Sequence, residues 1–117
     1  MSPFPNLRGA KYMSLATFRK DGREVCTPVW FAETDDGVVI FTNPNSGKVK
    51  RMRREARVRV APCTARGAVT GEWAEGGARF LEGDEGRQAW RAIKNKYWLA
   101  RLPIWWRSSA YIEITPA

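Results

Sequence analysis

The sequence predicts a mainly β protein with two helices, folded as a closed or nearly closed antiparallel barrel. Five or six segments have the alternation or the composition of β-strands and are separated by short turns. Only two segments have helical spacing, and 117 residues suffice for one modest core. A small sheet of this kind avoids exposed edges by closing on itself. We therefore expect one domain over residues 1–117.

The first part of the chain has the pattern of a three-stranded antiparallel meander. Residues 11–18 alternate between two faces, and the Lys-Asp-Gly sequence at 20–22 is typical of a hairpin turn. The β-rich residues 23–33 follow, then a second tight turn at 35–37 and a third strand at 38–42. The order of strands and turns predicts that each strand pairs with the next.

A short basic helix is expected within residues 43–57. Asn45 or Ser46 has the side chain of an N-cap, and Val49 and Met52 recur at helical spacing, so that both would face the core. The bases on the same segment would then lie on its solvent side.

The rest of the chain predicts two strands, a second helix and a last strand. Residues 57–63 alternate Arg with Val, and after a turn at 65–67 a long strand is expected over 68–82, broken by glycines. A helix with acids first and bases later begins at Asp84 and is expected to end near Pro103. The alternating tail at 108–117 completes the sheet.

Composition restricts the chemistry and the location. The chain has no histidine, which removes Ser-His and Cys-His catalysis, histidine-ligated zinc and the commonest general base. It has no apolar run long enough to span a membrane and no signal sequence at its start, so we expect a soluble cytoplasmic protein. Cys26 and Cys63 are expected to be free, buried or half-buried, inert thiols.

Charge is concentrated on the predicted basic helix. The whole chain carries 20 Lys and Arg against 12 Asp and Glu, a net charge of +8. Residues 48–59 hold seven bases and one acid, Glu55, so this segment alone carries 7 − 1 = +6. One interpretation is a capped helix with a solvated basic face. The other is a binding site for an anion, since such a surplus attracts polyanions.

The residues just before this helix favour the anion site. Thr42, Ser46 and the amides around Gly47 are hydrogen-bond donors at a helix N-terminus, and Lys48 adds a positive charge beside them. A strand followed by this loop and a helix start therefore predicts a phosphate-binding site.

The segment TPVWF at 27–31 carries the second candidate feature. Pro28 lacks an amide hydrogen, so its strand is expected at an edge or a bulge. Free backbone groups there would hydrogen-bond a flat polar ring beside Trp30. An ordinary edge strand with Val29 and Phe31 in the core explains the same spacing.

These stretches resemble a known family. TPVWF followed by SGKVKRMR, together with residues 11–37, 38–82 and 111–117, is similar to the pyridoxamine 5'-phosphate oxidase superfamily of flavin and deazaflavin split barrels. Within it the chain resembles the short actinobacterial-type enzymes that use the deazaflavin coenzyme F420. The resemblance covers nearly the whole chain, with a looser match in the second helix.

The resemblance implies a six-stranded split barrel that forms a homodimer, with a cofactor in each of two clefts at the interface. The strand from Cys26 to Phe31 would lay its backbone against the ring, and the loop and helix start would hold the phosphate. The turn at 66–68 would reach the ring, often from the partner subunit. The cofactor-binding residues so implied are Cys26, Thr27, Pro28, Val29, Trp30, Phe31, Phe41, Thr42, Ser46, Gly47, Lys48, Lys50, Arg51, Arg53, Arg66, Gly67 and Ala68.

The chain also departs from the vitamin B6 oxidases of that superfamily. Gly47 stands where they carry an Arg next to the phosphate-binding Lys, and their C-terminal substrate-binding Arg and His have no counterpart here. Pyridoxamine phosphate is therefore not the expected substrate. Flavin mononucleotide (FMN) ends in one phosphate, whereas F420 has a phosphodiester and a polyglutamate tail, which better explains a segment of charge +6.

The resulting hypothesis is an F420-dependent oxidoreductase that transfers a hydride to an unsaturated small-molecule acceptor, with no catalytic residue and no metal assigned. The expected partners exclude nucleic acid and membrane. Three alternatives stay open: an FMN oxidase or reductase of the same fold, a cofactor carrier, and a basic nucleic-acid-binding module. Trp105 and Trp106 are expected to cover either a barrel end or a dimer interface.

Overall fold

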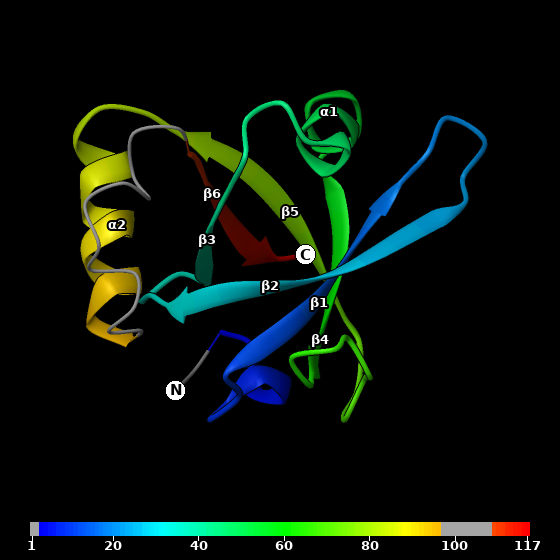
Figure 1. Cartoon of the computed structure of the whole chain (residues 1–117), viewed down its shortest axis with the longest axis horizontal. Coiled ribbons are helices and arrows are strands. Elements are labelled where there is room, and N and C mark those ends of the chain that lie inside the picture. Colours follow the sequence, from blue (N-terminus) through cyan, green and yellow to red (C-terminus); the bar gives the residue numbers. More distant parts are fainter. Residues whose placement is uncertain (1–2, 97–108) are drawn as a thin grey trace.

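The strands form one closed antiparallel barrel in the order β1-β2-β3-β6-β5-β4 (Figure 1). The computed structural model describes residues 3–96 and 109–117. The predicted fold class is therefore confirmed. Its elements are the 3-10 turn η1 (Pro5–Leu7), β1 (Tyr12–Phe18), β2 (Glu24–Glu33), β3 (Val38–Thr42), α1 (Gly47–Arg54), β4 (Arg57–Cys63), β5 (Ala74–Leu81), α2 (Asp84–Lys96) and β6 (Ala110–Pro116).

The predicted meander of the first three strands is confirmed by its register. β1 pairs with β2 from Tyr12 opposite Trp30 to Phe18 opposite Glu24, and β3 follows on the other side of β2. Alternation along each strand sends one set of side chains into the barrel. Leu15 and Phe31 belong to the inward set and are completely buried.

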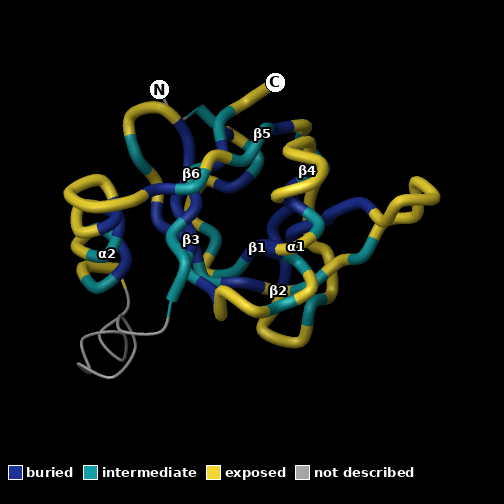
Figure 2. The backbone as a smooth tube through the Cα atoms, turned by 90° about the horizontal axis from the view of Figure 1, so that it is seen from above, coloured by how far each residue is buried: buried dark blue, intermediate teal, exposed yellow. Residues whose placement is uncertain are grey.

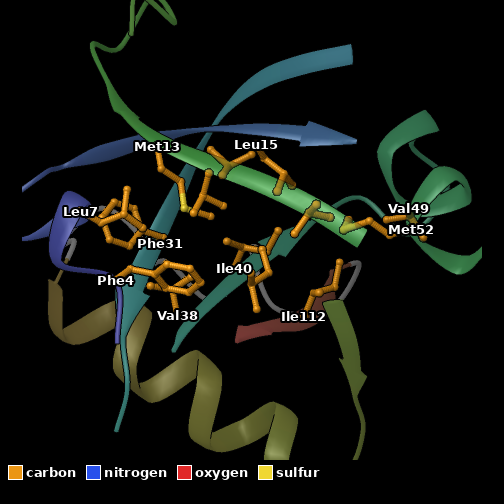
Figure 3. Packing of buried hydrophobic residues seen from close by; sticks show 14 residues of the cluster. Phe4, Leu7, Met13, Leu15, Phe31, Val38, Ile40, Val49, Met52 and Ile112 are labelled. Atoms are coloured by element: carbon orange, nitrogen blue, oxygen red, sulfur yellow. The ribbon is translucent and has the colours of Figure 1, made fainter. Parts of the chain in front are cut away.

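The two ends of the barrel are covered by different parts of the chain. Figure 3 shows Val49 and Met52 of α1 at one end of the core and Phe4 and Leu7 of the N-terminal segment at the other. Each of these four side chains is at most 2% exposed. The prediction that Val49 and Met52 face the core is therefore confirmed, and these two residues form the apolar contact of α1 with the barrel.

Helix α2 covers the outer face of the sheet beside β3 and β6 (Figures 1 and 2). Ala89 and Ile93 on its inner side pack with Val39 and Leu81 in a second apolar cluster. The exposed residues of α2 lie on the side away from the barrel, as expected for an amphipathic helix. The predicted end near Pro103, and the positions of Trp105 and Trp106, lie outside the described residues.

The prediction of a long strand over 68–82 is wrong for the first half of this range. β5 begins only at Ala74, and before it Val69 makes a single bridge to Cys63. Gly71 approaches Pro62 so closely that a Cβ at this glycine would lie 2.6 Å from the proline ring. Pro62 has no amide hydrogen, so a regular ladder between β4 and the segment before Ala74 would lack one hydrogen bond. This segment therefore forms a loop.

No helix in the described part of the chain is long and apolar enough to cross a membrane.

Lys96 connects α2 to the barrel and predicts a pH dependence of stability. Its Nζ donates to the Ala10 carbonyl at 2.9 Å and lies 3.5 Å from the centre of the Phe31 ring. Burial lowers its pKa from 10.5 to about 8, although the Glu33 carboxylate opposes the shift. Between these values the unfolded chain holds a proton that the folded chain has lost, so the free energy of unfolding should rise with pH in this window.

Urea unfolding measured from about pH 7.5 to about pH 10 tests this expectation. The wild type should show a rise that Lys96→Met lacks. Because other titrating groups are the same in both proteins, an identical pH dependence would contradict the assignment to Lys96.

Candidate functional site

One edge of β2 is left without a strand partner where the sequence predicted an edge. β2 pairs with β1 along its length from Glu24 to Trp30, but with β3 only through Phe31, Ala32 and Glu33. In the described part of the chain, no strand pairs with the other edge of β2 before Phe31. Pro28 lies in this open stretch, as predicted from its missing amide hydrogen. The described strands therefore leave this part of β2 with a ladder on one side alone.

The side chains of this stretch divide between the core and the outside. Val29 and Phe31 point inward and are buried, so they offer a bound ring only their backbone. Trp30 points outward and packs edge-on against Phe41 of β3, with ring centroids 6.0 Å apart. Cys26 also points outward and is exposed. The prediction of two buried or half-buried thiols is thus confirmed for Cys63 and wrong for Cys26.

The turn at 64–68 lies against the same stretch of β2. The Thr64 amide donates to the Ala68 carbonyl at 2.9 Å, and the Gly67 amide donates to the Thr64 carbonyl at 2.9 Å. Gly67 has a φ of +93°, which favours glycine, and a Cβ built there would lie 3.6 Å from Cδ of Pro28. The predicted residues Arg66, Gly67 and Ala68 are therefore brought beside the predicted ring-binding strand within one chain.

The loop between β3 and α1 is held by hydrogen bonds of its own. The Asn45 amide donates to Oδ1 of Asn43 at 2.8 Å, and the Ser46 amide donates to the Asn43 carbonyl at 3.0 Å. Ser46 is the N-cap residue, but its hydroxyl makes no capping bond. Its Oγ is buried and has no hydrogen-bond partner within the described structure. The hydroxyl is therefore left for a group that binds at the helix start.

The missing capping bond predicts a small stability effect. Ser46→Ala should lower the free energy of unfolding by less than about 0.5 kcal/mol, because the usual cost of about 1 kcal/mol reflects a capping bond that is not made here. Thr34→Ala is the matched control, since the Thr34 Oγ1 accepts the Gly37 amide at 3.1 Å. Urea unfolding measures both, and a loss for Ser46→Ala as large as that for Thr34→Ala would contradict the expectation.

Positive charges gather around the first turn of α1, a turn that contains no acidic residue. Burial and the nearby Arg51 guanidinium lower the pKa of Lys48, which is half-buried. Burial, Arg19 and Arg54 lower the pKa of Arg51. Every charged group that shifts either pKa is itself a cation. A bound anion would relieve this repulsion.

The other predicted bases are distributed along the helix. Lys50 is exposed, and the Arg53 guanidinium lies 4.1 Å from the centre of the Phe80 ring. Arg54 donates from Nη2 to the Phe18 carbonyl at 2.6 Å, which holds the end of α1 to the end of β1. Thr42 is only 9% exposed and lies on the inward face of β3, next to the loop. The predicted phosphate residues are therefore neighbours, whereas Arg53 lies one turn beyond them.

Two parts of this site were not predicted from the sequence. Thr17 of β1 accepts a hydrogen bond from Nε of Arg51 at 2.6 Å. The β1–β2 hairpin contributes to a basic cavity of about 310 Å³ at the end of α1. No local sequence signal links the hairpin to the helix, because strand pairing and helix packing bring them together. The cavity is lined by Phe18, Arg19, Lys20, Gly22, Arg54, Glu55 and Arg57.

The structure combines a closed six-stranded antiparallel barrel with a β2 edge that no described strand pairs before Phe31 and with a cationic helix start, the architecture of the split barrels. The family model described as pyridoxamine 5'-phosphate oxidase matches residues 5–117. The chain therefore belongs to the pyridoxamine 5'-phosphate oxidase family. No curated protein matches its sequence.

Solved structures share the same fold. A candidate 5-nitroimidazole antibiotic resistance protein from Bacteroides thetaiotaomicron is 16% identical with a TM-score of 0.77, over 95% of this chain and 75% of that one. The heme storage protein HutZ from Vibrio cholerae is 14% identical with a TM-score of 0.72, over 100% of this chain and 92% of that one. A pyridoxamine 5'-phosphate oxidase candidate from Listeria innocua is 16% identical with a TM-score of 0.69, over 94% and 86%. At these identities the likeness shows the fold alone.

Proposed function

We propose that this chain is an F420-dependent oxidoreductase that reduces an unsaturated organic acceptor. One observation carries the proposal: the same barrel holds a group of cations at the start of α1, with pKa values shifted only by burial and by other cations, and a β2 edge that no described strand pairs before Phe31. The cations suit the phosphate of a cofactor, and the strand edge suits its polar ring. Neither feature is required by the barrel itself.

The residues present fit such a cofactor. The unpartnered hydroxyl of Ser46, the amides of the first turn and Lys48 would hold the phosphate, with Thr42 at the base of the loop. The backbone of Thr27–Trp30 would hold the ring. The Thr27 side chain shares the barrel face of β2 with Val29 and Phe31, so this strand would contribute backbone groups to the ring.

The extent of the charge favours F420 over FMN. Beyond the first turn, positive side chains continue along α1 to the cavity formed with the β1–β2 hairpin, where Arg19, Lys20, Arg54 and Arg57 outnumber Glu55. A helix of eight residues is about 12 Å long, which exceeds the reach of a single phosphate. A phosphodiester followed by several carboxylates would meet positive charge over this whole length.

When bound, the reduced deazaflavin supplies the hydride. The residues of this chain then bind and orient: the β2 edge fixes the plane of the ring, the helix start fixes its phosphate, and Trp30 with Phe41 borders the ring-binding strand. No side-chain acid or base is assigned. The absence of histidine from the sequence agrees with a protein that positions a hydride carrier and supplies no catalytic base of its own.

We also propose a cytoplasmic homodimer whose subunits pair through the face that includes the outer side of β1, β2 and β4. Exposed Cys26 and Pro28 lie there, near Val69, which is 43% exposed and is the large hydrophobic residue most open to solvent among those described. Light scattering after gel filtration should give twice the mass of 13.3 kDa. A monomer at micromolar concentration would contradict this part of the proposal.

The alternatives are less well supported. An FMN enzyme of the same fold would use the first turn but leave the hairpin cavity unexplained. Heme binding, the function named for HutZ, would have to proceed without the histidine that commonly ligates heme iron. A nucleic-acid module would not require the open β2 edge. A cofactor carrier would bind F420 with the same affinity but transfer no hydride.

Parallel titration with F420 and FMN, followed by tryptophan fluorescence and cofactor absorbance, tests the proposal. F420 should bind with the lower Kd. If neither cofactor binds below roughly 0.1 mM, a binding free energy of about −5.5 kcal/mol, the proposed function is wrong. Turnover of F420 with a panel of nitro and enone acceptors then separates an enzyme from a carrier.

A further inference from the structure

A separate cavity lies on the α2 side of the barrel. It has a volume of about 300 Å³ and is bounded by the first turns of α2, the corner between β5 and α2, and the start of β6 (Figure 1). None of its lining residues belongs to the candidate functional site described above. The cavity is lined by Leu81, Glu82, Gly83, Gly86, Arg87, Trp90, Ser109 and Tyr111.

Two aromatic rings form the main apolar walls of this cavity. Trp90 of α2 and Tyr111 of β6 pack edge to face, with ring centroids 6.4 Å apart. Leu81 adds aliphatic surface and is only 8% exposed. Burial raises the pKa of Tyr111 to about 12, as expected for a phenol in apolar surroundings. Pockets that bind small molecules have mostly hydrophobic and aromatic walls of this kind.

Gly86 leaves space in the cavity that a side chain would occupy. It is a buried residue in the first turn of α2, and a Cβ there would lie 3.5 Å from Cδ2 of Tyr111 and 3.8 Å from the Leu81 carbonyl oxygen. Both are ordinary contact distances, so the packing of α2 on the barrel does not require glycine. Glycine is also a poorer helix former than alanine. What its missing side chain provides is room beside the Tyr111 ring.

The charges of the lining favour a neutral ligand. The lining holds one acid, Glu82, and one base, Arg87, so their formal charges cancel. Arg87 also donates from Nη1 to Oδ1 of Asp84 at 2.9 Å. By contrast, the cavity at the end of α1 is lined by four bases and one acid. The α2 cavity therefore lacks the surplus of positive charge that would select an anion.

We propose that this cavity binds a neutral, planar molecule of about two fused aromatic rings. The size follows from the volume, because an engineered cavity of about 150 Å³ in another protein holds one benzene ring. The rings would pack offset or edge-on against Trp90 and Tyr111, in the space that Gly86 leaves. The inference does not rest on the proposed function, since neither the flavin or deazaflavin nor any residue assigned to it enters the argument.

Calorimetric titration with 2-naphthol, which is uncharged at neutral pH, tests the class of ligand. It should bind with a Kd below about 1 mM. The saturated analogue 2-decalol keeps the two-ring skeleton without aromatic faces and should bind at least about fivefold more weakly. The anion 2-naphthoate should also bind more weakly than 2-naphthol. Equal or tighter binding of either analogue, or no binding of 2-naphthol, would overturn the inference.

Two variants test whether the ligand lies in this cavity. Gly86→Ala should weaken 2-naphthol binding about 3- to 10-fold and leave the melting temperature unchanged or raised, because the methyl group takes cavity space but favours the helix. Trp90→Leu removes an aromatic wall and should weaken binding about 3- to 10-fold. Trp73→Leu is the matched control and should change Kd less than about twofold. Trp73 is also half-buried, but it stacks against Arg59 and does not line the cavity.

The variants give outcomes that decide the location. If Gly86→Ala binds 2-naphthol as tightly as wild type, or if Trp73→Leu loses as much affinity as Trp90→Leu, the ligand lies elsewhere and the inference is wrong. Should Trp90→Leu fail to fold, Gly86→Ala still decides, because no loss of stability is expected for it. Binding of F420 or FMN enters neither result, so failure of the proposed function would leave this inference standing, and the reverse also holds.

Discussion

Lys48→Ala should weaken F420 binding about 10- to 100-fold without destabilising the protein. The ammonium is half-buried at the first turn of α1, where a charge-assisted hydrogen bond to phosphate is strong. In the free protein the same ammonium is repelled by Arg51, so its removal relieves a cost. Fluorescence titration gives the change in Kd, and urea unfolding gives the change in stability.

A second lysine serves as control for the loss of charge. Lys11→Ala removes one positive charge from an exposed residue that precedes β1 and should leave Kd within about twofold of wild type. If Lys48→Ala and Lys11→Ala bind F420 equally well, the phosphate does not lie at the start of α1. If both lose affinity equally, the attraction is a property of net charge and not of a site.

Gly37→Ala should destabilise the fold by about 3 kcal/mol or more. A Cβ at this position would lie 2.0 Å from the Ile114 carbonyl oxygen and 3.0 Å from its carbon. Both atoms belong to the backbone of β6, so the clash is not relieved by a side-chain rotation. Val38, the next residue, pairs with Ile114, and the substitution would therefore push apart β3 and β6 at the closure of the barrel. Thermal and urea unfolding report the loss.

Gly77→Ala is the matched control within the same sheet. It lies on β5 opposite Thr115 of β6, and a Cβ there meets nothing within 4 Å. Since alanine also reduces the entropy of the unfolded chain, stability should be unchanged or slightly higher. If Gly37→Ala and Gly77→Ala lose similar amounts of stability, the close approach of β6 is not the reason for glycine at position 37.

Elements that are defined by the spacing of side chains over a few residues were predicted correctly from the sequence. Ile112 and Ile114 alternate with Tyr111 and Glu113, and the two isoleucines are completely buried as that alternation requires. The start of α1 at Gly47 follows the predicted cap, although Ser46 makes no capping bond. Such features depend on the periodicity of the backbone over a few consecutive residues.

Features that depend on distant segments were predicted poorly. The sequence around Val69 has the composition of a strand, but its neighbour Pro62 lacks an amide hydrogen and Gly71 is pressed against the proline ring. The exposure of Cys26 likewise depends on whether another element covers the outer face of β2 at that point. Neither contact can be predicted from the residues of the segment alone.

The sequence by itself determined the mainly β class, the turns and the concentration of charge on α1, and it indicated Ser46 and Lys48 as candidate anion-binding residues. These follow from side-chain chemistry and short-range spacing. Only the tertiary structure decided that Arg51 is held by Thr17, that the hairpin joins the basic helix, and that β2 keeps one edge open. The physical reason is that the orientation of a long charged side chain is set by the buried groups that reach it, and in a closed barrel those groups come from strands distant in sequence.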